Sequence, residues 1–232
     1  MKIRDFYYYR LSNLGLDGYL RVSSSGRGDE TSFSSKNSIS IEESKIDNVK
    51  VDDSLLTFHN NNKDVFFNGD FVGGEIKSRG FINLNERSKK RSTLALEADT
   101  KRMNEYMGIL SVHNINKRDL AGAVSLKAEA DFNLSDLSDL NFKAIVSDAY
   151  FKYADVVLKK QKEDLELIVE NGKVKKWNIE LVGKSASFES RGQGQWGKNF
   201  NIETDFLLSA SLLELLSDNI ERARGEVKGT IN

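Results

Sequence analysis

The chain has 232 residues, of which 39% are hydrophobic and 30% charged, and its 34 basic and 35 acidic residues give a formal net charge of -1. This composition is rich enough for a folded core, and the mixed charges argue against a nucleic-acid partner, which requires a basic face. No stretch approaches the roughly 18 unbroken apolar residues of a membrane-spanning helix. The absence of cysteine excludes disulfides, zinc thiolate sites and thiol nucleophiles.

Proline is also absent, whereas an average chain of this length would contain about a dozen at ~5% usage. Proline cannot donate a hydrogen bond to a sheet and is confined to edges and bulges. Its absence therefore favours long, continuous β-sheet, although a biased composition would produce the same result. The N-terminal segment is basic but is interrupted by Arg10, Ser12 and Asn13, so it lacks the apolar run of a signal peptide. An N-terminal segment of this kind is expected of a cytosolic protein or of an excised fragment.

Alternating apolar and polar residues recur along the chain and predict β-strands. The expected strands are residues 18–24, 38–42, 45–51, 55–59, 65–71, 75–84, 93–98, 121–134, 142–146, 150–159, 164–169, 173–182, 186–191 and 200–208. Turns rich in Asn, Asp and Gly are expected at residues 59–64, 135–139 and 170–172. The strongest hairpin signal is Asn171-Gly172, because both residues tolerate the positive φ of a type I′ turn. Residues 159–164 fit a helix or a charged turn, and the flanking alternation favours two strands.

Two short amphipathic helices are expected between the strands, at residues 101–110 and 211–222. The second begins with Ser211 and Glu214, which have the spacing of a capping box. The first has its apolar residues spaced for one helical face. Each helix precedes a segment that resembles the start of the first strand.

Three segments begin alike, at residues 16–22, 120–126 and 223–229, which indicates a repeat of about one hundred residues. A second similarity follows in the same order, between residues 71–80 and 181–192, and both copies end in Ser-Arg-Gly. We therefore expect a first unit at residues 1–119, a second at 120–222 and the start of a third at 223–232, forming one continuous elongated body. Without the repeat, the chain would be an ordinary all-β domain.

The sequence offers no convincing catalytic site. His59 and His113 lie in turn-like sequence without partners for metal binding or a catalytic triad. The polar segment 26–29 contains the tripeptide that integrins recognise, but so short a match is weak. The aspartates at 52–53 and 136–139 lack calcium-loop spacing. We predict no catalytic residue, no metal site and no cofactor.

The apolar residues of the expected strands point to one face, because alternate residues share a face of a sheet. Such a face fits the interior of a two-layer sandwich or an elongated groove that takes acyl chains, and both require the same alternation. The repeat favours the groove. The residues expected to line it are Val124, Leu126, Phe132, Leu165, Leu167, Val169, Trp177, Ile179, Leu181, Ile202, Phe206 and Leu208.

The strand rhythm and glycine placement of residues 165–174, 177–181 and 185–194 resemble the AsmA-like superfamily, and within it the TamB-like proteins of the translocation and assembly module. Residues 38–41, 45–51 and 69–84 have the same rhythm. The resemblance covers most of the chain but includes no signature motif. It implies a taco-shaped β-groove in the periplasm, as a fragment of a protein whose inner-membrane anchor lies outside this chain. Its implied partners are phospholipids and an Omp85-family outer-membrane protein.

The resulting prediction is a mainly β, elongated, repeat-built curved sheet with two short amphipathic helices. Its expected function is phospholipid transport between the inner and outer membranes through an apolar β-groove, without catalysis. The alternative is a structural or scaffold β-protein with a filled core, involved in outer-membrane protein or secretion assembly. A lipopolysaccharide-transport bridge is a third possibility, against which the length of the repeat and its helices argue. An enzyme is the least supported class.

Overall fold

The computed structural model describes residues 17–29, 32–46, 49–85, 88–101, 120–153, 156–161, 163–184, 186–195, 199–209 and 225–231. These residues form β-strands joined by turns and short connections, and none of them belongs to a helix. The prediction of a mainly β chain is confirmed. The helices expected at residues 101–110 and 211–222 lie outside the described residues, except for Lys101, which is not helical.

The chain divides into two compact units, of which the first comprises Met1–Ala98 and Glu129–Asp136. Six complete strands and most of a seventh belong to this first unit. They are β1 (Asp17–Gly28), β2 (Phe33–Ile46), β3 (Val49–Val51), β4 (Ser54–Asn61), β5 (Asp64–Phe71), β6 (Ile76–Asn83) and β7 (Ser92–Thr100), the last of which extends two residues beyond the unit.

The second unit comprises Asp99–Ala128 and Leu137–Asn232. It contains most of β8 (Leu120–Asn133) and β9 (Asp136–Tyr153), and all of the strands that follow. These are β10 (Val156–Lys160), β11 (Leu165–Glu170), β12 (Lys173–Val182), β13 (Ser187–Gly194), β14 (Phe200–Ser209) and β15 (Glu226–Ile231).

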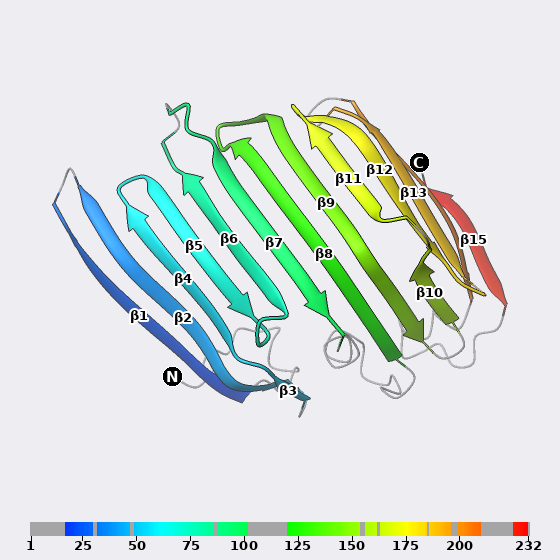
Figure 1. The fold of residues 1–232 in the computed structure, drawn as a ribbon, viewed down its shortest axis with the longest axis horizontal. Helices are drawn as coiled ribbons and strands as arrows, with labels where there is room; N and C mark the ends of the chain where they lie inside the picture. Colours follow the sequence, from blue (N-terminus) through cyan, green and yellow to red (C-terminus); the bar gives the residue numbers. More distant parts are fainter. Residues whose placement is uncertain are drawn as a thin grey trace. The chain divides into compact units, whose positions relative to one another are not determined.

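The hydrogen-bonded strand order is β1-β2-β4-β5-β6-β7-β8-β9-β10-β12-β13-β14-β15, with β3 beside β2 and β11 between β9 and β12 (Figure 1). Consecutive strands of the chain are therefore mostly neighbours in the sheet, as in a meander. All of the strand pairs whose register is known are antiparallel, as β4 with β5 and β12 with β13. Short turns explain this order, because antiparallel neighbours can be joined by hairpins of two residues.

The hairpin between β11 and β12 confirms the strongest turn prediction. Asn171 has a φ of 48° and Gly172 a φ of 69°, the combination that a type I′ turn requires. The Gly172 N–H donates a hydrogen bond to the Leu140 carbonyl at 2.8 Å, and the Asn171 N–H donates to Asn141 Oδ1 at 2.9 Å. The turn is thereby fixed against β9.

Other boundaries differ from the prediction. Residues 136–139 were expected in a turn, but β9 begins at Asp136, and the turn contains only Leu134 and Ser135. Residues 142–146 and 150–159 were expected as two strands, but β9 continues to Tyr153 and a separate strand, β10, follows. Residues 26–28 lie outside the strand expected at 18–24 but form the end of β1, because they pair with the start of β2. Strand pairing outweighed the local preference of serine and glycine for loops.

Candidate ligand-binding face

The apolar face of the second unit follows from the strand register, because directly opposed residues lie on the same face of a sheet. Leu167 of β11 lies opposite Trp177 of β12. On the other side of β12, Ile179 lies opposite Ser190 and Leu181 lies opposite Phe188. The alternation along each strand adds Leu165 and Val169 to the same face.

The face continues across the next strands. Phe188 of β13 lies opposite Phe206 of β14, and Gly192 lies opposite Ile202. Leu208 lies opposite Val227 of β15. The predicted lining residues on β11, β12 and β14 therefore share one face, namely Leu165, Leu167, Val169, Trp177, Ile179, Leu181, Ile202, Phe206 and Leu208.

The other three predicted lining residues are on β8. Val124, Leu126 and Phe132 share one face of that strand, because their positions along it differ by even numbers. All three are half-buried. Phe132 belongs to the first unit, whereas Val124 and Leu126 belong to the second.

Part of the second unit's apolar face is closed by packing. Val156, Leu158 and Ala186 form a buried cluster, against which Phe151, Leu181 and Leu208 pack. Leu165 and Val169 are also buried, at 7% and 6% exposure. The other predicted residues of this face, such as Trp177 and Phe206, keep part of their surface accessible.

Aromatic rings on this face lie over glycines of the neighbouring strand. A Cβ on Gly192 would lie 2.6 Å from atoms of the Trp177 ring, and one on Gly229 would lie 2.5 Å from the Phe206 ring. The first unit repeats the arrangement, since a Cβ on Gly80 would lie 2.4 Å from the Phe67 ring. The missing side chains let the rings lie low against the sheet and cover its backbone.

A short polar chain crosses the apolar face of the second unit. The Trp177 indole N–H donates to Ser190 Oγ at 3.2 Å, and Ser190 Oγ lies 3.0 Å from Thr204 Oγ1. Ser190 is only 3% exposed. Because each polar group has a partner, these side chains do not carry the cost of an unsatisfied buried group.

The first unit also has one apolar face, built by the same register rule. Ile39 of β2 lies opposite Leu56 of β4, and Phe58 of β4 lies opposite Phe67 of β5. None of the apolar side chains described in the first unit is fully buried. The described strands of this unit therefore present an apolar face that no second described layer closes.

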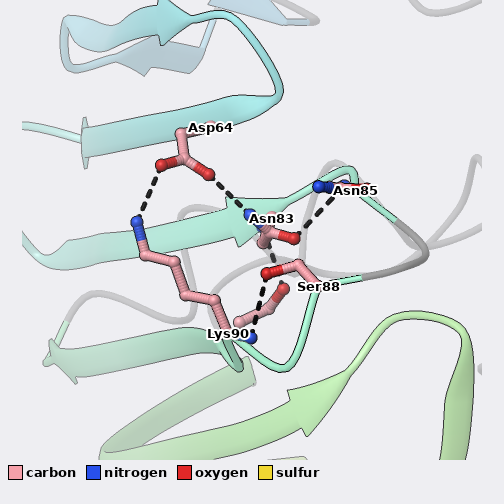
Figure 2. A network of polar contacts seen from close by, with 6 residues as sticks. Asp64, Asn83, Asn85, Ser88 and Lys90 are labelled. Atoms are coloured by element: carbon pink, nitrogen blue, oxygen red, sulfur yellow. Dashed lines mark hydrogen bonds and ion pairs between the residues drawn. The ribbon is translucent and has the colours of Figure 1, made fainter.

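The opposite face of the first unit is mainly polar, although Phe66 and Phe81 pair on it, and it contains a network around Asp64 (Figure 2). Lys90 Nζ donates to Asp64 Oδ2 at 2.7 Å, and Asn83 Nδ2 donates to Asp64 Oδ1 at 2.6 Å. The hydrogen bonds from Lys90 and Asn83 lower the pKa of the Asp64 carboxyl from its ordinary value. The Lys90 ammonium also lies 4.1 Å from the centre of the Phe81 ring, within cation–π distance.

This network borders an open cavity of about 620 Å³ at the end of the first unit's strands. The cavity is lined by Asp29, Ser32, Phe33, Asn61, Asn62, Lys63, Asp64, Asn83, Asn85, Ser88 and Lys90. Its two lysines and two aspartates are balanced, and Lys90 is already paired with Asp64. The cavity therefore has no net charge to attract an ion.

On the polar face of the second unit, Lys176 forms an ion pair with Glu166. The hydrogen bond to Glu166 raises the pKa of the Lys176 ammonium. His59, noted in the sequence, lies in β4 rather than in a turn, and its Nδ1 lies 2.9 Å from the Ser35 carbonyl oxygen. Within the described ranges, no three His, Asp or Glu side chains gather closely enough to hold a metal ion.

Comparisons with known proteins give no relative: no protein-family model, no curated protein and no solved structure matches the chain. In the part of the chain that the structure describes, no helix is long and apolar enough to cross a membrane.

The sequence did not reveal the hydrogen-bonded side chains on the two faces of the sheet. The chain Trp177–Ser190–Thr204 spans three strands, so it becomes visible only once their register is known. The pairing of Lys90 with Asp64 joins residues that are 26 positions apart. The glycine of each Ser-Arg-Gly segment could have been noted as a place for a neighbouring ring, because an isolated glycine in a strand often marks a close approach.

Proposed function

We propose that this chain binds acyl chains along its apolar sheet face and is a fragment of a bridge-like lipid-transport protein. The observation that carries the proposal is the apolar face of the first unit, where no described apolar side chain is fully buried. Large exposed apolar surfaces are uncommon on soluble proteins and mark interaction sites. Consecutive strands extend this face through residues such as Ile39, Leu56, Phe58 and Phe67.

The face suits a chain-like ligand that moves. Each buried methylene contributes about 0.8 kcal/mol, and the contribution is not directional. A lipid tail would therefore be held by many equivalent contacts and slide between them. Aromatic rings that lie low over glycines, such as Phe67 over Gly80, make the apolar surface smooth, without protruding side chains.

The finer parts of the proposal rest on the resemblance to the AsmA-like superfamily. They are transport of phospholipids between the inner and outer membranes, a periplasmic location, an inner-membrane anchor outside this chain and an Omp85-family partner. No catalytic step is part of the proposal.

Charged substitutions on the two faces of one strand test it. Leu56→Lys places an ammonium group on the apolar face of β4, and Thr57→Lys places the same group on the opposite face. Because burial of a Leu side chain contributes about 1.5–3 kcal/mol, we expect Leu56→Lys to reduce bound lipid roughly tenfold or more and Thr57→Lys to have little effect. Native mass spectrometry, followed by organic extraction, measures the lipid retained by the purified protein.

The second unit offers the matched pair Ile179→Lys and Asn178→Lys on β12. Circular dichroism must show that each variant is folded. A folded wild-type protein without lipid, or equal lipid in both members of a pair, would contradict the proposal. The buried cluster of Val156, Leu158 and Ala186 would then favour the scaffold alternative, in which side chains fill the interior.

A further inference from the structure

A hollow of about 320 Å³ lies on the hairpin of β1 and β2. Three consecutive cross-strand pairs build it: Ser25 with Lys36, Gly26 with Ser35, and Arg27 with Ser34. In the outer two pairs, all four side chains point to the same face, because their positions differ by two along each strand. The middle pair, Gly26 and Ser35, has its side-chain positions on the other face of the sheet. Only the backbone of this pair therefore forms the floor of the hollow.

The hollow is therefore bordered by two cations and two hydroxyl groups. Lys36 and Arg27 lie across one diagonal of this square, and Ser25 and Ser34 lie across the other. Directly opposite Cβ atoms in an antiparallel pair are about 4.5–5.5 Å apart. Side chains at this spacing can surround a single small anion from four sides.

Neither cation is neutralised by a described neighbour. Arg27 and Lys36 form no ion pair within the described ranges, whereas Arg21, on the same face of β1, pairs with Glu42 at 2.8 Å. The strand on the far side of β2 places His59 opposite Lys36 and Asn61 opposite Ser34. Asp29, the described carboxylate nearest to Arg27 along the chain, accepts a hydrogen bond from the Ser32 N–H.

We propose that this hollow binds a phosphate group. An Arg guanidinium presents paired N–H donors that match phosphate oxygens, and a Lys ammonium adds a compact positive charge. The two serine hydroxyls can donate to the remaining oxygens. The phosphate can be a free one or the head group of an anionic lipid, and both present the same oxygens. This site lies on the polar face, so it does not depend on the binding of acyl chains.

Isothermal titration calorimetry with inorganic phosphate, in a buffer free of other multivalent anions, tests the free form. We expect the wild-type protein to bind, and Arg27→Gln and Lys36→Gln each to weaken binding about tenfold, because each removes charge-assisted hydrogen bonds. Lys143→Gln is the matched control, since Lys143 is an exposed lysine of β9 outside the hollow and loses the same charge.

Flotation with phosphatidylcholine vesicles, with and without phosphatidic acid, tests the lipid form. Vesicle binding that requires phosphatidic acid and is lost in Arg27→Gln, but not in Lys143→Gln, would support the site with lipid as the source of phosphate. Absence of both kinds of binding in wild-type protein, or equal binding by Arg27→Gln, Lys36→Gln and Lys143→Gln, would overturn it. Folded Arg27→Gln should retain as much extractable lipid as wild type, so failure of this site and failure of acyl-chain binding are distinguishable.

Discussion

Asp64 accepts hydrogen bonds from two side chains of the first unit, and this makes its charge state a local contributor to stability (Figure 2). Lys90, the larger cause, lowers the pKa of the carboxyl. We expect Lys90→Gln to raise the pKa of Asp64 toward its ordinary value, whereas Lys89→Gln, which changes the adjacent lysine, should leave it in place. Carboxyl chemical shifts followed by NMR against pH measure both effects.

The sign of the accompanying stability effect follows from proton linkage. A carboxyl whose pKa is lower in the folded protein stabilises the fold above its unfolded pKa, and this contribution is lost as pH falls through the folded pKa. The difference in urea midpoint between wild type and Lys90→Gln should therefore shrink below pH ~4, the ordinary range of Asp. A difference that stays constant down to pH 2 would show that the pair contributes through packing alone.

The hairpin of β11 and β12 depends on one residue of its turn. Gly172 has a positive φ of 69°, and a Cβ there would lie 2.2 Å from the Ser138 carbonyl oxygen. Gly172→Ala should therefore lower the free energy of unfolding by about 1–2 kcal/mol for the backbone conformation alone, and by more if β9 must move. Chemical denaturation measures the loss. Asn171→Gly is the control, because glycine accepts the φ of 48° at that position, and a loss as large as that of Gly172→Ala would contradict the explanation.

The elements also show what sequence could and could not predict. The Asn171-Gly172 turn was found because both residues favour the same rare φ, and β12 was found because its alternation is regular. The end of β1 was missed because Gly26, Arg27 and Gly28 show no alternation of apolar and polar residues and form a strand only by pairing with β2. The start of β9 was missed for the same reason, since residues 136–139 carry two aspartates and a serine.

The candidate face was predictable to a similar extent. Alternation was enough to group Trp177, Ile179 and Leu181, because they lie on one strand. It could not show that Leu165 and Val169 are buried while Trp177 stays partly exposed, since the sequence does not show that β11 lies between β9 and β12. The hollow at Arg27 and Lys36 was not predictable either, because it requires the register of β1 against β2.

At the scale of the whole molecule, the two units differ in how much they bury. Every fully buried apolar side chain among the described residues belongs to the second unit, including Val156, Leu158 and Ala186. Because regions with few buried contacts open at low free energy, we expect amides of β4 and β5 to exchange faster than those of β10 and β11. Hydrogen exchange measured by mass spectrometry gives the order. Equal protection, or greater protection of β4 and β5, would contradict this expectation unless bound lipid is present in the sample.

The rings that lie over glycines have a consequence for how such a chain can evolve. At Trp177 and Gly192, as at Phe206 and Gly229 and at Phe67 and Gly80, one strand provides a large side chain and its neighbour provides none. A larger residue at the glycine is tolerated only if the ring becomes smaller. In divergent relatives, the two positions of such a pair are therefore expected to change together. Covariation of the two positions would then identify the strands that carry them as neighbours in the sheet.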